Sequence, residues 1–374
     1  MNNKVLLATV FTGYNYGSCL QAFAGMTFLK KQGYDCSLVA RRSLIKGRNV
    51  HLGKLFTLLC RSLMLKGKSN SLSTYHKLYA RTLVGDSAER FDKFIAENLS
   101  PNYLSWGELK NRAKESVACF AGSDQIWNSS SLYVDPLYYL RFAPSCKRVA
   151  FAPSFGRDFI PDYNVDKMSN WIGSFTCLST REDSGVKLIK EYTGRDALQL
   201  IDPTLMLSRE EWTKALGLEA LDKKYILAYF LDEPSSKAQG LIRNLSAKLN
   251  CKVVALPYIS DIDYSDETVA AGPKEFLELI KSAVVVCTDS FHGTAFSINF
   301  HTPFYVFERN YGNAQKQSSR IISLLTQTKM LHRYEVSEVE DGRHINFSFS
   351  DGVLEQERAK AVQYIISSIS HCAS

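Results

Sequence analysis

The chain has 374 residues, of which 45% are apolar and 22% charged, a composition typical of globular proteins and a length that suits two domains. It contains no run of 18 uncharged apolar residues and no signal-peptide pattern at its start, so we expect a cytoplasmic protein without a membrane-spanning helix. Its nine cysteines form no C-x-x-C pair, which favours reduced buried thiols over disulfides or a metal site.

The net charge of +7 comes from one part of the chain. Between Cys36 and Gly85 there is no acidic residue, and the basic residues there are Arg41, Arg42, Lys46, Arg48, Lys54, Arg61, Lys66, Lys68, Lys77 and Arg81. The rest of the chain is therefore slightly acidic.

The first half of the chain alternates between strands and helices. The apolar run at 4–11 predicts a buried strand, which leads through a Gly-containing loop into a helix that ends at Gly33. This βαβ opening is typical of a doubly wound parallel sheet. We predict further strands near 37–40, 116–124, 148–156 and 197–207, the last with a break at Pro203. Residues 176–192 predict a strand, a polar loop and a helix whose first turn contains Glu182 and Asp183.

After Pro203 the same alternation begins again, which predicts a second α/β domain. Its expected strands lie near 224–231, 251–257, 284–287 and 303–307, and its expected helices near 236–250, 272–283 and 293–301. We predict domains at 1–204, with a basic insertion at about 41–110, and at 205–346. Residues 347–374 form a C-terminal part, in which 347–349 is a connector and 352–370 an amphipathic helix that packs back on the first domain.

Five polar loops follow the predicted strands: TGYNYGS, GSDQIWN, APSFGR, STRED and TDSFHG. Ligands of open α/β sheets gather at the carboxyl ends of strands, so these loops predict a cleft between the two domains. The simpler interpretation is that each loop is polar because it is solvated.

Several side chains in these loops are candidates for binding. The first loop precedes a helix N-terminus, where an anion is favoured. GSDQIWN is either a turn or a site in which a carboxylate, a hydroxyl and an amide position sugar hydroxyls. The chain shows no nucleotide fingerprint. It also shows no metal-ligand spacing and no recognised nucleic-acid module, so we expect no bound metal and no nucleic-acid partner.

Three arginines and one histidine lie on strand-end loops. Arg181, Arg309 and Arg320 are able to form a fork-like receptor for phosphate or carboxylate, although an isolated surface arginine is usually only solvated. His292 titrates near neutrality and suits proton transfer, although a histidine at this position is often structural.

Taken together, the motifs resemble the polysaccharide pyruvyl transferase family. The resemblance rests on NYGSCLQAFA, GSDQIWN, FAPSFG, STREDSGVKLIKE, DPTLML, DSFHGTAFSINFHTPF and SSRI, which occur in family order between about residues 9 and 325. It implies two Rossmann-like domains that face each other across a cleft, as in GT-B glycosyltransferases. It also implies transfer of pyruvate from phosphoenolpyruvate onto two hydroxyls of a sugar, with formation of a ketal and release of phosphate.

The resemblance also assigns roles to residues. His292 would transfer protons, and no cofactor or metal is implied beyond phosphoenolpyruvate as donor substrate. A common family version has an arginine two residues before the histidine, where this chain has Ser290. Phosphoenolpyruvate would be bound by Arg181, Arg309, Arg320, Ser290 and Gly293. The acceptor would be bound by Asn15, Tyr16, Gly17, Ser123, Asp124, Gln125 and Ser154.

The basic segment has two interpretations. Residues 54–67 resemble an interfacial amphipathic helix, which suits docking of region 41–85 on the anionic inner face of a membrane. The acceptor would then be a surface polysaccharide, such as an exopolysaccharide or capsule, or its lipid-linked precursor. Alternatively, the helix covers the first domain and its lysines are solvated.

Other functions stay open at this point. The chain is alternatively a GT-B-type glycosyltransferase that uses a nucleotide sugar, or a non-catalytic glycan-binding member. A third possibility is an enzyme that moves pyruvate or another group onto something other than a glycan.

Overall fold

The computed structural model describes residues 2–44, 50–64, 84–256, 263–309, 319–337 and 345–373. The basic residues Lys46, Arg48, Lys66, Lys68, Lys77 and Arg81 lie outside these ranges. The chain forms two compact units. Unit 1 comprises Met1–Tyr79, Ile95–Met206 and Glu357–Ser374, and unit 2 comprises Ala80–Phe94 and Leu207–Gln356.

Unit 1 is built on a five-stranded parallel sheet in the order β3-β2-β1-β4-β5. Its strands are β1 (Lys4–Ala8), β2 (Asp35–Arg41), β3 (Asn102–Leu104), β4 (Ala118–Ala121) and β5 (Arg148–Ala150). The order reverses between β1 and β4, as in a doubly wound fold. The edge strand β3 lies inside the predicted insertion and has no counterpart among the predicted strands, because three residues carry no periodic signal. A second, two-stranded sheet pairs β6 (Ser179–Thr180) with β7 (Leu198–Gln199).

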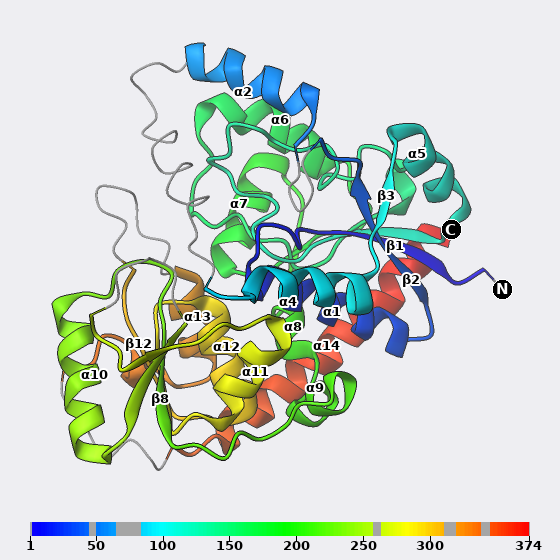
Figure 1. The fold of residues 1–374 in the computed structure, drawn as a ribbon. Coiled ribbons are helices and arrows are strands. Elements are labelled where there is room, and N and C mark those ends of the chain that lie inside the picture. Colours follow the sequence, from blue (N-terminus) through cyan, green and yellow to red (C-terminus); the bar gives the residue numbers. More distant parts are fainter. Residues whose placement is uncertain are drawn as a thin grey trace. The chain divides into compact units, whose positions relative to one another are not determined.

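Helices cover both faces of this sheet. On one face, α1 packs so closely that a Cβ on Gly25 would lie 3.3 Å from Leu7 and 3.6 Å from Phe151. The Tyr364 hydroxyl donates a hydrogen bond to the Ala150 carbonyl of β5, which fixes the C-terminal helix to unit 1 as predicted. Apolar side chains of α5, α6 and α7 join the core on the opposite face. Figure 1 shows α5 beside β3.

The helices of unit 1 are α1 (Tyr16–Lys31), α2 (Leu52–Met64), α5 (Trp106–Glu115), α6 (Asp162–Gly173), α7 (Asp183–Thr193) and α8 (Pro203–Met206), with the short helical turns Ile95–Leu99 and Ser145–Lys147.

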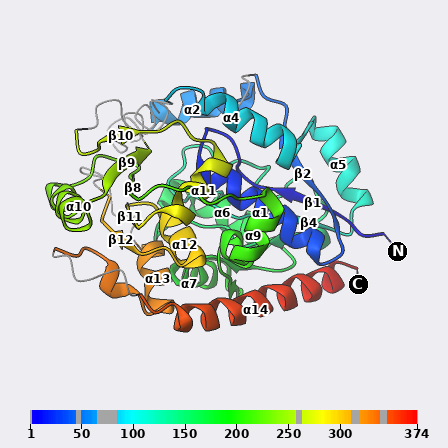
Figure 2. The same cartoon turned by 60° about the horizontal axis from the view of Figure 1, so that its bottom comes forward.

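Unit 2 repeats the arrangement with a parallel sheet in the order β10-β9-β8-β11-β12. Its strands are β8 (Tyr225–Tyr229), β9 (Lys252–Leu256), β10 (Glu267–Thr268), β11 (Val285–Thr288) and β12 (Phe304–Val306). Its helices are α4 (Ser87–Phe94), α9 (Arg209–Leu216), α10 (Ser236–Leu249), α11 (Pro273–Ser282), α12 (Phe291–Phe300) and α13 (Ser319–Gln327), with the short turn Leu331–Arg333. In Figure 2 the sheet lies between α10 on one side and α11 and α12 on the other. The predicted α/β class with two doubly wound parallel sheets is confirmed.

The last helix, α14 (Ser348–Ala373), begins earlier than predicted. Residues 347–349 were expected to form a connector, and this expectation is wrong for Ser348 and Phe349. The helix extends because the Phe347 carbonyl accepts a hydrogen bond from the Asp351 N–H, which forms its first turn. The Phe347 ring also stacks on His301, with ring centroids 4.7 Å apart, and so holds the start of the helix on unit 2.

Among the described residues, no helix is long and apolar enough to cross a membrane. The nine cysteines are all free; Cys146 is exposed, Cys60 and Cys177 are half-buried, and the other six are buried. Burial raises the pKa of the Cys36 and Cys119 thiols to about 12, so both are protonated and unreactive at neutral pH.

Candidate functional site

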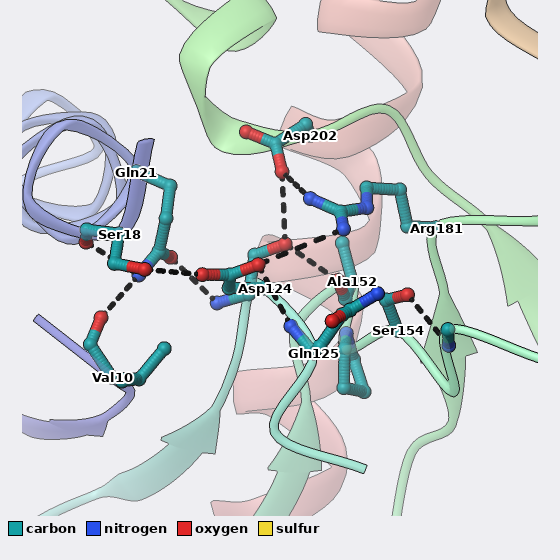
Figure 3. A network of polar contacts seen from close by, with 12 residues as sticks. Val10, Ser18, Gln21, Asp124, Gln125, Ala152, Ser154, Arg181 and Asp202 are labelled. Atoms are coloured by element: carbon teal, nitrogen blue, oxygen red, sulfur yellow. Dashed lines mark hydrogen bonds and ion pairs between the residues drawn. The ribbon is translucent and has the colours of Figure 1, made fainter. Parts of the chain in front are cut away.

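The loop after β4 holds Asp124 between a hydroxyl and a guanidinium (Figure 3). Ser18, in the first turn of α1, donates a hydrogen bond to Asp124 Oδ2 at 2.7 Å. On the other side, Arg181 Nη2 lies 3.8 Å from Asp124 Oδ1, which also accepts from the Gln125 N–H at 2.9 Å. The Asp124 side chain is 13% exposed, so its carboxylate is both fixed in place and partly accessible.

Arg181 is itself buried against a second carboxylate. Its Nη1 donates to Asp202 Oδ2, and its side chain is only 3% exposed. Burial alone would lower the pKa of the guanidinium, but the charges of Asp202, Asp124 and Glu182 outweigh burial and raise it above its usual value. Arg181 therefore stays charged, and its charge is balanced inside unit 1.

Hydrogen bonds between buried polar groups fix the loop that carries Asp124. Gln21 of α1 is fully buried, and its Oε1 accepts from the Ser123 N–H at 3.1 Å while its Nε2 donates to the Val10 carbonyl at 2.7 Å. The Ser123 hydroxyl donates to the Ala152 carbonyl at 2.6 Å. Ser123 is thus a structural residue of this loop, with no exposed surface.

Gly122, which precedes this loop, has a φ of +134°. A Cβ at this position would lie 1.9 Å from the Phe151 carbonyl oxygen. Only glycine fits this close approach of two backbone segments.

A second polar cluster joins the loop after β5 to the start of α7. The Ser154 hydroxyl donates to Glu182 Oε1 at 2.9 Å, and the Phe155 N–H donates to the same oxygen at 2.8 Å. The half-buried Gln125 side chain lies beside Gly156, where an added Cβ would come within 2.6 Å of its Nε2. Glu182 was expected to lie in the first turn of α7; it is instead the N-cap residue, with its carboxylate turned to this cluster.

The first loop reaches the same region through α1. Asn15 is the N-cap of α1 and accepts from the Ser18 N–H at 3.2 Å, while Tyr16 and Gly17 form the first turn. Ser18 therefore links this helix start to Asp124. Hydrogen bonds therefore join the acceptor residues predicted from three loops of unit 1: Ser18 links the first loop to Asp124, and the Ser154 N–H donates to the Asp124 carbonyl. An ion pair joins Asp124 to Arg181 (Figure 3).

In unit 2, His292 lies in the first turn of α12, directly after β11, and is 8% exposed. Ser290 is the N-cap of this helix, and its hydroxyl accepts from the Gly293 N–H at 3.3 Å. Gly293 allows α12 to pack on β11, because a Cβ there would lie 2.6 Å from Thr288 Oγ1. Ser290 and Gly293 thus set the position of the helix turn that carries His292.

Asp289 connects this turn to Arg309. Arg309 Nε lies 3.2 Å from Asp289 Oδ2, and the other oxygen, Oδ1, accepts from the Leu231 N–H at 2.7 Å. Burial raises the pKa of Asp289, and the charge of Arg309 acts against this rise. Arg309 keeps 18% of its side chain exposed, so part of the guanidinium is accessible.

Arg320, on α13, lies near Phe291, the residue that precedes His292. Its guanidinium carbon is 5.9 Å from the centroid of the Phe291 ring, and the residue is 9% exposed. The His292 ring is 5.3 Å from the same Phe291 ring and perpendicular to it. Phe291 is therefore a neighbour of both His292 and Arg320.

The three arginines proposed as one receptor divide between the units. Arg309 and Arg320 belong to unit 2 and contact Asp289 and Phe291 next to the start of α12, whereas Arg181 belongs to unit 1 and is paired with Asp202 and Asp124. Across the described ranges, no group of three or more His, Cys, Asp or Glu side chains is placed to hold a metal ion.

Five residues of these networks were not among the predicted site residues: Ser18, Gln21, Glu182, Asp202 and Asp289. Asp202 stands in the DPTLML motif, and Ser18 is the last residue of the predicted first loop, so their sequence positions carried a signal. Asp289, Gln21 and Ser18 each have a partner that is 58, 102 and 106 residues away along the chain, respectively, which periodicity cannot reveal.

A family model described as polysaccharide pyruvyl transferase matches residues 15–311. The match includes every predicted site residue except Arg320. Comparison with curated protein sequences found no match.

Solved structures resemble the chain only distantly. A UDP-GlcNAc 2-epimerase from Methanocaldococcus jannaschii is 11% identical, with 97% of this chain and 92% of that chain covered and a TM-score of 0.44. The corresponding epimerase from Neisseria meningitidis, bound to UDP-GlcNAc, is 10% identical, with 94% and 99% covered and a TM-score of 0.41. A glycosyltransferase from Streptomyces nogalater is 10% identical, with 100% and 98% covered and a TM-score of 0.37. Likenesses at this level carry neither a substrate nor a reaction over to this chain.

Proposed function

Because the chain belongs to the polysaccharide pyruvyl transferase family, we propose that it transfers pyruvate from phosphoenolpyruvate onto two hydroxyls of a saccharide. The acceptor is a surface polysaccharide or its lipid-linked precursor. The products are a cyclic ketal and inorganic phosphate.

The reaction needs both proton transfer and charge neutralisation. The methylene carbon of phosphoenolpyruvate gains a proton while a sugar hydroxyl adds to the neighbouring carbon and loses its own proton. A second hydroxyl then displaces phosphate from that carbon. The donor carries a phosphate and a carboxylate close together, so its binding site must supply positive charge in a partly dehydrated setting.

The observation that carries the proposal is the setting of His292 at the start of α12. A nearly buried histidine lies in the first turn of this helix, and the two residues that flank the N-cap Ser290 each have an arginine as a neighbour: Arg309 pairs with Asp289, and the Arg320 guanidinium lies 5.9 Å from the Phe291 ring. The N-terminal end of a helix adds partial positive charge to the same place. We assign the proton transfer to His292 and the donor anion to Arg309 and Arg320, with Ser290 and Gly293 shaping the turn.

Arg181 receives a different role within this proposal. It was first considered as a third anion ligand, but two carboxylates already balance its charge in unit 1. We propose that Arg181 holds Asp124 in place, and that Asp124 orients an acceptor hydroxyl. The other predicted acceptor residues lie in the loops around Asp124 or next to them: Asn15, Tyr16, Gly17, Gln125 and Ser154.

Replacement of His292 tests the assignment. His292→Asn should lower the rate of phosphate release from phosphoenolpyruvate by about 10²–10⁴-fold with a sugar acceptor, because positioned acid/base groups contribute about this much. The assay combines phosphate release with mass spectrometry of the pyruvylated product across a panel of aryl glycosides. His301→Asn is a matched control, since His301 caps the other end of α12 and lies in the left-handed region that asparagine tolerates. A rate for His292→Asn within a few-fold of wild type rules out the role.

Thermal-shift measurements separate this function from its alternatives, because a ligand raises the melting temperature of the state it binds. We expect stabilisation by phosphoenolpyruvate and none by UDP-sugars. Stabilisation by a UDP-sugar alone would favour a glycosyltransferase. Saccharide binding without turnover would favour a non-catalytic glycan-binding protein.

A further inference from the structure

Helix α2 (Leu52–Met64) exposes an apolar side to solvent. Leu52, Leu55, Phe56 and Leu59 are 74%, 48%, 69% and 59% exposed. Their spacing of three and four residues places them on one side of the helix. A soluble protein normally turns such a stripe towards its core, so this surface is a candidate binding site.

The opposite side of α2 is polar and faces unit 1. Arg61 donates hydrogen bonds to Asn164 Oδ1 at 2.6 Å and to the Tyr163 carbonyl at 2.9 Å, both on α6. The Lys54 ammonium lies 5.9 Å from the centroid of the Tyr133 ring. Figure 1 shows α2 running next to α6. The helix is thus held by its basic side and presents its apolar side outward, the reverse of a helix that covers a core.

The sequence around this helix is strongly basic. Segment 36–85, which contains α2, has ten basic and no acidic residues. Lys167 of α6 is also near Arg61: burial lowers the pKa of its ammonium, and the charge of the Arg61 guanidinium lowers it further. The composition of this segment therefore favours a negatively charged partner with an apolar interior.

We propose that α2 docks the protein on a membrane surface that contains anionic lipids. An exposed stripe of leucine and phenylalanine side chains on a helix within a basic segment is typical of helices that lie in the plane of the lipid headgroups. A second protein fits less well, because stable protein interfaces bury about 20–30 residues on each side and α2 offers four apolar side chains. The inference concerns location and does not depend on pyruvyl transfer.

Vesicle flotation of the full chain tests this inference. We expect binding to vesicles of phosphatidylcholine with phosphatidylglycerol, weaker binding as salt is raised, and little binding to phosphatidylcholine alone. The double variant Phe56→Ser/Leu59→Ser should bind at least about tenfold more weakly, because two exposed apolar anchors are lost. The control Leu331→Ser/Ile366→Ser removes two apolar side chains, each 46% exposed, elsewhere on the surface and should bind like wild type.

Several results would overturn the proposal. One is the absence of salt-sensitive binding to the anionic vesicles, and another is unchanged binding by the α2 variant. A third is a dimer, measured by light scattering, that the α2 variant abolishes, since the apolar side would then be an interface between two copies of the chain. Both variants should keep the thermal shift with phosphoenolpyruvate, so failure of docking is distinguishable from failure of the proposed function.

Discussion

Neutralising Asp202 should weaken unit 1 through its effect on Arg181. Asp202 is 1% exposed, accepts hydrogen bonds from Arg181 and from Thr204 at 2.8 and 2.9 Å, and lies 3.3 Å from the Ser123 hydroxyl. In Asp202→Asn the remaining counter-charges of the guanidinium are Asp124, 3.8 Å away, and Glu182. Removing one partner of a buried ion pair costs about 3–5 kcal/mol. Since Asp124 remains and an amide oxygen can still accept from Thr204, we expect about 3 kcal/mol.

A double-mutant cycle identifies the charge pair as the cause. The variants are Asp202→Asn, Arg181→Met and their combination, measured by urea unfolding with tryptophan fluorescence. Three of the four tryptophans, Trp106, Trp127 and Trp171, lie in unit 1, so the signal reports mainly on the unit that contains the pair. The combined variant should lose about 1–3 kcal/mol less than the sum of the single losses, because it leaves no unpaired guanidinium.

Additive losses would refute this reasoning. If the double variant equals the sum within about 0.5 kcal/mol, the two side chains stabilise unit 1 independently. A loss below about 1 kcal/mol for Asp202→Asn alone would likewise show that the pair is not needed to stabilise the Asp124 loop.

Three further changes have defined outcomes. Gly293→Ala places a Cβ 2.6 Å from Thr288 Oγ1 and should lower the free energy of unfolding by about 1–3 kcal/mol; an unchanged melting temperature would contradict the close packing. The pKa of Asp289 is raised by burial against the charge of Arg309, so the folded state binds this proton more tightly than the unfolded chain. The free energy of unfolding of wild type, relative to that of Asp289→Asn, should therefore fall as the pH rises from the ordinary Asp pKa of 3.8 through the raised pKa. A relative stability of wild type that grows with pH in urea titrations would contradict this sign. Tyr364→Phe removes the 2.7 Å hydrogen bond to a β5 carbonyl and should cost about 1 kcal/mol in the same unfolding assay, whereas no loss would mean that water replaces the bond.

The sequence predicted the alternation of strands and helices because buried parallel strands are continuous apolar runs. It missed β3 and β10, whose three and two residues are too few for a pattern, and placed the start of α14 too late because a polar FSFSD stretch resembles a connector. Both failures concern elements whose formation depends on tertiary partners. For β3 the partner is β2, and for the first turn of α14 it is the His301 ring.

The sequence predicted which residues belong to the candidate site better than it predicted the interactions that each of them makes. Asp124, Arg181 and His292 were recognised as polar groups at strand ends, and the structure places each at such an end. Their partners could not be predicted, since the Asp202 carboxylate and the Ser18 hydroxyl are brought to them only by the fold. The orientation of α2 was equally hidden, because the sequence of an amphipathic helix shows two faces without showing which of them contacts the protein.

The close backbone approach at Gly122 divides the neighbouring loop into a part that is fixed and a part that can be redesigned. Gly122 admits no side chain, and Ser123 is locked by buried hydrogen bonds, so a combinatorial library should leave both untouched. Gln125 is half-buried and rests against Gly156, so it is the position in this loop at which substitution can change shape without breaking the backbone path. An effort to alter which sugars the protein accepts would therefore begin at Gln125.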